Sequence, residues 1–247
     1  MINLYEFAPA WGIPNLGAFC VKTETFLRMT GLDYEIKYTV PLSAPKGKLP
    51  YIEDNGNKIA DSRFIIDYLK KQYGVDPDKD LTSEEKAIST SFQRLIEDDL
   101  YWVMIYARWG NKDANWALNK QAIFGGLPPV IRDIVSALVR KQILKQIHGH
   151  GMGRHSTEEI YHLGRVSLTA LSDFLGEKTF FMGSKPTTLD AAAFGVLANI
   201  IWCPVQSPLK EHALKQENLG AFCDRMKQQF FAGKQSNVAK EKAKEAA

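Results

Sequence analysis

The spacing of hydrophobic and polar residues changes once along the chain, near residue 76. Before that point apolar residues alternate with polar ones or form short runs, which predicts strands over residues 2–7, 34–40, 51–52 and 58–60 and helices over 17–29 and 62–73. After residue 81 the apolar residues recur with the period of a helix. We predict helices over 83–108, 113–123, 129–147, 157–175, 188–201 and 219–230. The pattern is therefore β-α-β-β-β-α followed by helices alone.

A polar segment that contains a proline separates the two patterns. Gly74 follows the second predicted helix and is a typical helix stop, and a run of aspartates around Pro77 comes next. We predict an α/β domain over residues 1–75, a linker over 76–84 and an all-helical domain over 85–232. Residues 233–247 are rich in charge and lack an apolar stripe, so we predict a disordered tail there.

Composition and charge narrow the class of protein. Of 247 residues, 45% are apolar and 24% are charged, which is ordinary for a soluble globular protein. A net charge of +3 without a basic stripe argues against nucleic-acid binding. The apolar run over 189–205 is too short for a comfortable membrane span, and the first residues lack the pattern of a secretory signal. We expect a cytoplasmic protein with no membrane span.

The cysteines and histidines do not predict a metal site. Cys20, Cys203 and Cys223 are far apart and form no Cys-x-x-Cys pair, and their odd number indicates a reducing compartment. The glycine-rich segment from His148 to His155 contains three histidines, but it lacks a pair spaced by four residues and an acidic ligand. We interpret this segment as a loop with solvated or capping side chains, and we expect no metal.

Lys48, Leu49 and Pro50 come directly before the strand-forming pair Tyr51-Ile52. A proline at this place cannot donate to a strand ladder, and its restricted geometry suits a sharp corner, with a cis bond as one option. Such a corner leaves the main-chain amide and carbonyl of Leu49 free. An extended cysteinyl peptide can pair with both groups as an added strand. Taken alone, a proline before a strand usually marks only a turn.

Asp61 and Ser62 open the second predicted helix. A hydroxyl together with the free amides at a helix start forms a site for a carboxylate, although the same residues are often only a helix cap. The order of corner, strand, hairpin turn at Asn55-Gly56, strand and helix is much rarer than either feature alone. The combination predicts a site for an extended, charged tripeptide, and the tripeptide we expect is glutathione.

This combination, joined to an all-helical segment, resembles the cytosolic glutathione S-transferase superfamily over nearly the full chain. The resemblance implies an α/β thioredoxin-like N-terminal domain of the β-α-β-α-β-β-α type and an all-α C-terminal domain. In the segment 180–190, Thr187 and Asp190 look like the capping box with which that family starts a buried helix. The role of that box is folding rather than chemistry.

Two further segments are similar to one branch of the superfamily, which contains the metaxins and failed axon connections. One is residues 15–20, which continue into Glu24, Leu27 and Arg28, and the other is residues 151–155. Members of this branch include proteins with import or adaptor roles as well as glutathione-dependent proteins.

The resemblance implies that glutathione is a co-substrate, held by Lys48, Leu49, Pro50, Asp61 and Ser62. In such transferases a hydroxyl or thiol near the start of the first helix lowers the pKa of the glutathione thiol. Here that position falls on Gly17, which has no side chain, so the catalytic residue stays unassigned. Three candidates remain: an amide donor at Asn15, a thiol at Cys20 that we interpret mainly as buried core, and the loop residue Trp11, which would cover the thiol or simply fill space.

The resemblance also implies a second-substrate pocket between the domains. Its expected lining is Trp11, Tyr101, Ile105, Arg108 and Trp109, an aromatic wall that suits a small apolar electrophile. The alternative is that this spacing merely packs a helix.

Two functions are compatible with these observations. The first is a glutathione transferase, or a glutathione-dependent thiol reductase or peroxidase, that acts on a small apolar electrophile. The second is a non-catalytic interaction module of the metaxin type, which the lack of a side chain at Gly17 favours. We favour the enzyme because the residues that match the tripeptide site are present, and the resemblance implies a homodimer.

Overall fold

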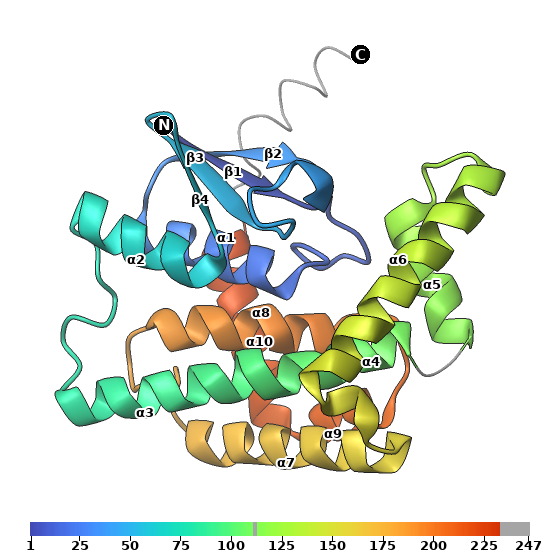
Figure 1. The fold of residues 1–247 in the computed structure, drawn as a ribbon. Coiled ribbons are helices and arrows are strands. Elements are labelled where there is room, and N and C mark those ends of the chain that lie inside the picture. Colours follow the sequence, from blue (N-terminus) through green and yellow to red (C-terminus); the bar gives the residue numbers. More distant parts are fainter. Residues whose placement is uncertain (111–112, 233–247) are drawn as a thin grey trace.

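The computed structural model describes residues 1–110 and 113–232. Its first part contains β1 (Ile2–Glu6), α1 (Ala18–Thr30), β2 (Tyr34–Tyr38), β3 (Tyr51–Asp54), β4 (Asn57–Ala60) and α2 (Ser62–Tyr73). Figure 1 shows this part as a small sheet with α1 and α2 on one side of it, resting on a layer of helices. The predicted tail over 233–247 lies outside the described residues.

The sheet has the strand order β2-β1-β3-β4. Strand β1 runs parallel to β2, while β3 is antiparallel to both β1 and β4. Ile2 and Leu4 alternate with outward residues and pack against Phe26 of α1 and Ile65 of α2, because successive strand side chains point to opposite faces. This mixed sheet with two helices on one face is the thioredoxin-like arrangement that the resemblance implied.

The connection between β2 and β3 differs from the β-α-β-α-β-β-α type. A full helix in that place is replaced by a single 3-10 turn, η1 (Pro41–Ser43). Ala44 and Leu49 of this connection cover the second face of the sheet, where the rings of Tyr5 and Tyr51 stack with centroids 4.3 Å apart.

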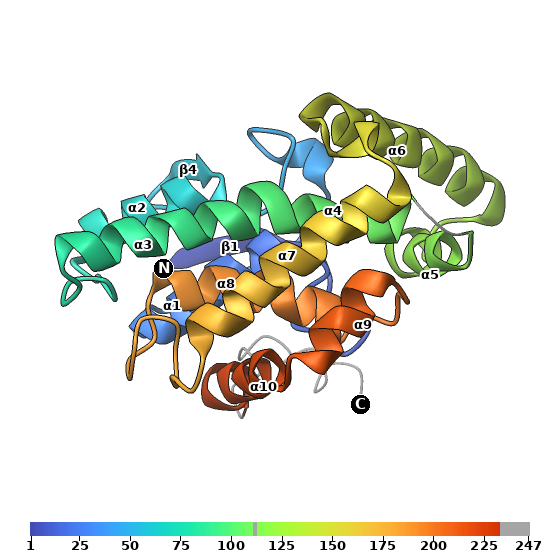
Figure 2. The ribbon, with the colours of Figure 1, turned by 90° about the horizontal axis from the view of Figure 1, so that it is seen from below.

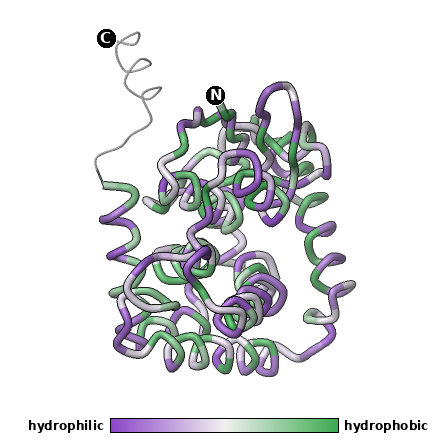
Figure 3. Tube along the Cα trace, turned by 90° about the vertical axis from the view of Figure 1, so that its left-hand side faces the viewer, coloured by the Kyte–Doolittle hydropathy of each residue, from purple (hydrophilic) through white to green (hydrophobic). Residues whose placement is uncertain are grey.

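The second part is entirely helical within the described residues. Its helices are α3 (Ser83–Arg94), the π-helical segment η2 (Leu95–Leu100), α4 (Tyr101–Trp109), α5 (Asp113–Phe124), α6 (Pro129–His150), the short 3-10 helix η3 (Met152–Arg154), α7 (Thr157–Leu175), α8 (Thr188–Ile201), α9 (Pro208–Lys215) and α10 (Glu217–Phe231). The predicted helix over 83–108 is continuous in space but contains the π-turn. Figure 3 shows hydrophobic and hydrophilic residues interspersed along these helices, as expected where one face is buried.

Helix α9 was missed by the pattern analysis. It has only eight residues, which is too short for a clear helical period. Neighbouring residues nevertheless mark the start of this helix. The Ser207 hydroxyl accepts a hydrogen bond from the amide of Lys210, and Pro208 occupies the first helical position.

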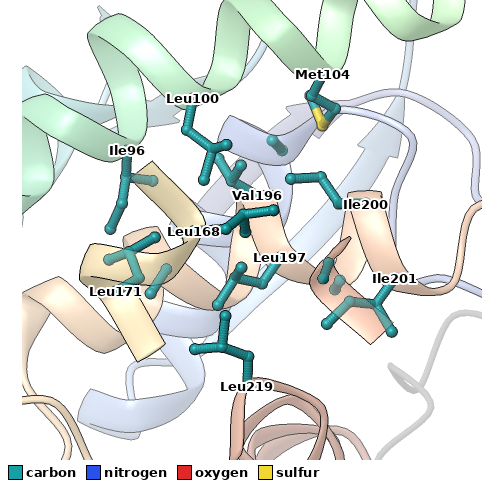
Figure 4. Close-up of a cluster of buried hydrophobic side chains, with 14 of the residues drawn as sticks. Ile96, Leu100, Met104, Leu168, Leu171, Val196, Leu197, Ile200, Ile201 and Leu219 are labelled. Atoms are coloured by element: carbon teal, nitrogen blue, oxygen red, sulfur yellow. The ribbon is translucent and has the colours of Figure 1, made fainter. Parts of the chain in front are cut away.

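The core of the helical part surrounds α8, which is buried along its whole length. Figure 4 shows side chains of α8, among them Leu197 and Ile200, meeting Leu100 of η2, Leu168 of α7 and Leu219 of α10. A helix that is apolar on every side is stable only when neighbours cover all of it. The N-terminal capping box between Thr187 and Asp190 is confirmed.

Helix α1 lies directly on α8, and this contact joins the two parts. A Cβ atom added at Gly195 of α8 would lie 2.3 Å from the main-chain oxygen of Ala18 in α1. Only glycine allows backbones to approach this closely. The start of α1 is therefore held at a fixed place above the helical layer.

No single helix within residues 1–110 and 113–232 is long and apolar enough to cross a bilayer. Helices α5 and α6 reach the required length and composition only as a pair, and that pair is bent by 115°. Figures 1 and 2, which view the molecule from directions 90° apart, both show this pair reaching away from the other helices.

Candidate functional site

The corner before β3 has the geometry that the sequence indicated. The Leu49–Pro50 peptide bond is cis, and both residues are buried while Lys48 is exposed. Leu49 packs with Tyr51 and Cys20. Among the hydrogen bonds of the described residues, none uses the main-chain amide or carbonyl of Leu49. Both groups are therefore available to an extended peptide.

Asp61 and Ser62 lie at the start of α2, at the end of β4. Asp61 has a positive φ of 82°, and its side chain accepts a hydrogen bond from the amide of Arg63. Ser62 is the first helical residue and is buried. Its hydroxyl and the free amides of the first turn are donors for an anion, and the helix dipole adds to their effect.

A buried lysine that the sequence analysis missed stands behind this anion site. Lys22 of α1 donates to the hydroxyl oxygen of Ser62 across 3.4 Å and forms an ion pair of 2.5 Å with Glu97 of η2. Glu97 also pairs with Arg63 at 2.7 Å. Burial lowers the pKa of Lys22, and the Glu97 carboxylate opposes that effect. The one signal in the sequence is a lysine inside an apolar helix, since lysine is seldom buried without a partner.

Asn15 and Gly17 shape the turn that leads into α1. The Asn15 amide donates to the main-chain oxygen of Phe7 across 2.5 Å, and its oxygen accepts from the amide of Gly17 across 2.9 Å. A Cβ atom at Gly17 would lie 2.9 Å from the sulfur of Cys20 and 3.1 Å from the Phe7 ring. The structure therefore gives Asn15 a structural role and leaves no room for a side chain at Gly17.

Cys20 lies in the first turn of α1, and its side chain faces the interior. Its side chain is fully buried, and burial raises the pKa of the thiol well above its ordinary value. The nearby Glu6 carboxylate raises this pKa further. A thiol in such surroundings stays protonated and behaves as a small hydrophobe.

Trp11 lies in the loop before α1 with a positive φ of 57° and is half-buried. The Arg108 guanidinium lies 5.4 Å from the centre of its ring. Arg108 is itself 5% exposed, and it donates to the main-chain oxygen of Leu16 and to both oxygens of Asn199 on α8, at 2.6 to 2.9 Å. Arg108 therefore holds the loop onto the helical layer from below.

The residues expected to line a second-substrate pocket lie in different parts of the structure. Tyr101 packs against Phe19 of α1, 4.6 Å between ring centres, and burial raises the pKa of Tyr101 to about 12. Ile105 is half-buried against the main core. Trp109 is buried beside Trp116 of α5, which places it away from α1. Of the aromatic residues expected in the pocket, Tyr101 thus contacts α1 and Trp11 lies in the loop before it.

The His148–His155 segment is not the loop that we predicted, because it contains the last residues of α6 and the short 3-10 helix η3 before α7 begins. His150 stacks on Trp102 at 4.7 Å, and Arg154 donates to the main-chain oxygen of His148. Within the part of the chain that the structure describes, no group of three or more His, Cys, Asp or Glu side chains is placed to hold a metal ion.

Family comparisons agree with this geometry. The family model for the glutathione S-transferase N-terminal domain matches residues 18–115, and that for the C-terminal domain matches residues 164–226. The chain is 37% identical over 238 residues to the isoprene-epoxide–glutathione S-transferase of Rhodococcus sp. (strain AD45), with 93% of this chain and 99% of that protein covered.

Two other relatives carry names that do not mention glutathione. The chain is 36% identical over 243 residues to Failed axon connections of Drosophila melanogaster, covering 94% of this chain and 58% of that protein. It is 26% identical over 241 residues to metaxin-1 of Mus musculus, covering 93% and 75%.

Solved structures share the fold at low sequence identity. A glutathione transferase of Phanerochaete chrysosporium, GSTFuA3, has a TM-score of 0.63 at 19% identity and covers 92% of this chain and 96% of its own. The β-etherase LigF of Sphingobium sp. strain SYK-6 has a TM-score of 0.58 at 15% identity and covers 92% and 94%. The chain belongs to the glutathione S-transferase family, in the branch that includes the metaxins and Failed axon connections.

Proposed function

We propose that the protein binds reduced glutathione and adds its sulfur to a small apolar electrophile. The observation that carries the proposal is that the chain has both the main-chain groups of Leu49 and the hydroxyl of Ser62, which we assign to the two ends of one site. One end offers a free amide and carbonyl beside a cis proline, and the other offers a buried hydroxyl at a helix start. Lys22, next to Ser62, adds a positive charge to the carboxylate end.

In this proposal the cysteinyl main chain of glutathione pairs with Leu49 and the γ-glutamyl carboxylate lies at Ser62. Lys48 and Asp61, both exposed beside these groups, are placed to contact the charged ends of the tripeptide. The sulfur then points toward the start of α1. The main-chain amides of the first turn of α1 are the donors that the chain offers to a thiolate, since Gly17 carries no hydroxyl.

The relative that acts on an isoprene epoxide supports an epoxide as the electrophile. In that reaction the thiolate attacks one ring carbon, a carbon–sulfur bond forms and the carbon–oxygen bond of the ring breaks. The alkoxide that forms stays attached to the product and takes up the proton that the thiol released. Tyr101 and Trp11 would form the apolar wall beside the reacting carbon. A thiol reductase or peroxidase that uses Cys20 is less well supported, because this thiol is buried and protonated.

The non-catalytic interaction module is a second candidate. The observation that favours it is the turn before α1, where Gly17 has no room for a side chain and the amide group of Asn15 is already bonded at both ends. Failed axon connections and metaxin-1 are relatives over nearly the whole of this chain. A homodimer and a cytoplasmic location remain predictions under both candidates.

Calorimetric titration with reduced glutathione tests the proposal, together with turnover assays that use propylene oxide and 1-chloro-2,4-dinitrobenzene. Ser62→Ala is expected to weaken glutathione binding about tenfold or more, because a hydrogen bond to a charged group is lost. Ser89→Ala, at an equally buried serine of α3, is the matched control and should bind like the wild type.

The outcomes separate the two candidates. Binding that depends on Ser62, with turnover of the epoxide, supports the transferase. Binding without turnover of either electrophile supports the interaction module. No binding by the wild type would mean that the site has lost its ligand and that the proposal is wrong.

A further inference from the structure

The hairpin of α5 and α6 exposes an unusual amount of apolar surface. Sixteen large hydrophobic side chains are exposed among the described residues, and half of them lie within residues 118–144. They are Leu118, Ile123, Leu127, Val130, Ile131, Ile134, Leu138 and Leu144. Scattered single hydrophobic residues are normal on a surface, whereas a gathered set marks a contact site.

The apolar and basic residues of α6 share one outward face. Ile134, Leu138, Lys141 and Lys145 follow one another at spacings of four, three and four residues, which places them along one side of a helix. All four are exposed, with Ile134 at 58% and Leu138 at 64%. The face is therefore apolar toward the tip of the hairpin and basic toward its base.

The opposite face of α6 is used within the molecule. Ser136 and Ile147 are buried there, and Arg140 donates to the main-chain oxygen of Trp109 while it lies over the ring of Trp116. These contacts fix the hairpin by its base. The outward face is left unpartnered by the described residues, and Figures 1 and 2 show the hairpin reaching away from the other helices.

Charge is concentrated on the same hairpin. Residues 113–150 contain five Lys and Arg residues and two Asp residues, a net charge of +3, which equals the net charge of the whole chain. A groove of about 340 Å³ between α5 and α6 is lined by Lys120, Arg140 and Lys141, among other residues. Lys120 pairs with Asp133 at 2.9 Å, but no ion pair found in the described residues involves Lys141 or Lys145.

The hairpin also lies largely outside the two matched family domains. Residues 116–163 fall between the N-terminal match and the C-terminal match. The proposed glutathione site is built by other elements, at the start of α2 and before β3.

We propose that the outward face of the α5–α6 hairpin docks on an anionic lipid surface. A helix with apolar residues and lysines on its exposed surface binds such an interface by burying the apolar side chains about 5–10 Å deep while the lysines meet the phosphates. Lys141 follows Ile134 by seven residues, which is about 10 Å along a helix. The lysines are thus at a suitable distance to lie among headgroups when Ile134 is inserted.

Charge complementarity favours a lipid surface over a second copy of the chain. A two-fold dimer contact joins the same face of both copies, so that Lys141 and Lys145 of each copy would be gathered in one interface. Like charges gathered in one interface oppose association. An anionic bilayer supplies the opposite charge and also adapts to a protruding helix.

The test is co-sedimentation of the full chain with vesicles of phosphatidylcholine, with and without phosphatidylglycerol. We expect binding to the anionic vesicles that is about tenfold or more stronger than to the neutral ones and that weakens as salt is added. Ile134→Glu/Leu138→Glu and, separately, Lys141→Gln/Lys145→Gln should each reduce it about tenfold or more. Leu214→Glu, at a side chain of α9 that is 57% exposed, is the matched control and should bind like the wild type.

The melting temperature and glutathione titration of each variant show whether it is folded and whether the first site is intact. The proposal is overturned if the wild type does not sediment with anionic vesicles, or if Leu214→Glu weakens binding as much as the hairpin variants do. It is also overturned if light scattering shows a dimer that Ile134→Glu/Leu138→Glu dissociates and that anionic vesicles do not dissociate. Loss of glutathione binding alone leaves the vesicle result intact, so the two proposals fail independently.

Discussion

The ammonium group of Lys22 lies 3.4 Å from the hydroxyl oxygen of Ser62, although the two residues belong to different helices. Lys22 is 2% exposed and Ser62 is 4% exposed. Glu97 of η2 completes the contact from the helical layer by pairing with Lys22 and with Arg63. A buried positive charge, held by a carboxylate, therefore stands directly behind the proposed carboxylate site.

Replacing Lys22 by methionine tests the role of this charge. We expect Lys22→Met to weaken glutathione binding about tenfold, because a charge-assisted contact to the carboxylate end is lost. We also expect the free energy of unfolding to fall by about 3 kcal/mol, since Glu97 loses one of two cations in a buried place. Calorimetry and urea unfolding measure the two effects separately.

Lys58→Met, at an exposed lysine of β4, is the control for the loss of one positive charge. It should leave both quantities near their wild-type values. If Lys22→Met lowers stability and leaves glutathione affinity unchanged, Lys22 only joins the helices and has no part in the site.

The close contact of α1 and α8 depends on Gly195. A Cβ atom there would lie 2.3 Å from the main-chain oxygen of Ala18, and a backbone atom cannot turn aside as a side chain can. We expect Gly195→Ala to lower the free energy of unfolding by about 3 kcal/mol or more. Urea unfolding with a tryptophan fluorescence readout measures the loss.

Gly220→Ala in α10 is the matched control for that substitution. Nothing lies within 4 Å of a Cβ at Gly220, so alanine should be neutral or gain up to about 1 kcal/mol from its better helix propensity. Equal effects at the two glycines would show that propensity, and not the contact of the helices, decides the result.

Glu6 of β1 predicts a dependence of stability on pH. Burial, and then the Glu24 carboxylate, raise the pKa of Glu6 well above its ordinary value, while Asn15 and Arg28 oppose this effect. Its Oε2 atom is buried without a hydrogen-bond partner among the described residues. The folded protein thus keeps a proton that the unfolded chain releases above about pH 4.3. The contribution of Glu6 to stability is greatest at low pH and is lost as the pH rises through the folded-state pKa.

Glu6→Gln removes the charge and keeps the shape. We expect this variant to be more stable than the wild type by about 1 kcal/mol or more at about pH 8, with the gain shrinking toward about pH 4. Urea unfolding at both pH values measures the difference. Glu177→Gln, at an exposed glutamate, should show no such dependence, and a gain from Glu6→Gln that is equal at both pH values would contradict the explanation.

Arg108 provides a test of the expected second-substrate pocket. Its guanidinium is bonded to Leu16 and Asn199, so Arg108→Met would leave buried acceptors without donors. We expect a loss of about 3 kcal/mol or more in unfolding free energy, together with weaker glutathione binding as the loop before α1 loosens. Thermal unfolding and calorimetry check both. A variant that folds normally and changes only the KM for the electrophile would instead place Arg108 in the pocket.

The local features of this chain were predictable from its sequence. The strands, most helices, the Leu49–Pro50 corner, the helix start at Ser62 and the Thr187–Asp190 capping box involve residues within a few positions of one another. Such features follow from side-chain period, proline geometry and hydroxyl caps. Helix α9 was missed because eight residues are too few to show a period, and the π-turn at η2 has no sequence rule of this kind.

The composition of the site was decided by tertiary structure. Lys22 and Glu97 are 75 residues apart in sequence, and Arg108 and Asn199 are 91 residues apart. Their pairing depends on how α1 settles on the helical layer, which the close approach at Gly195 controls. The sequence by itself determined most of the elements that form and the two segments to which the proposed tripeptide site was assigned. Only the packing decided which buried charges stand behind that site, because a charged residue finds its partner through space and not through the period of its own helix.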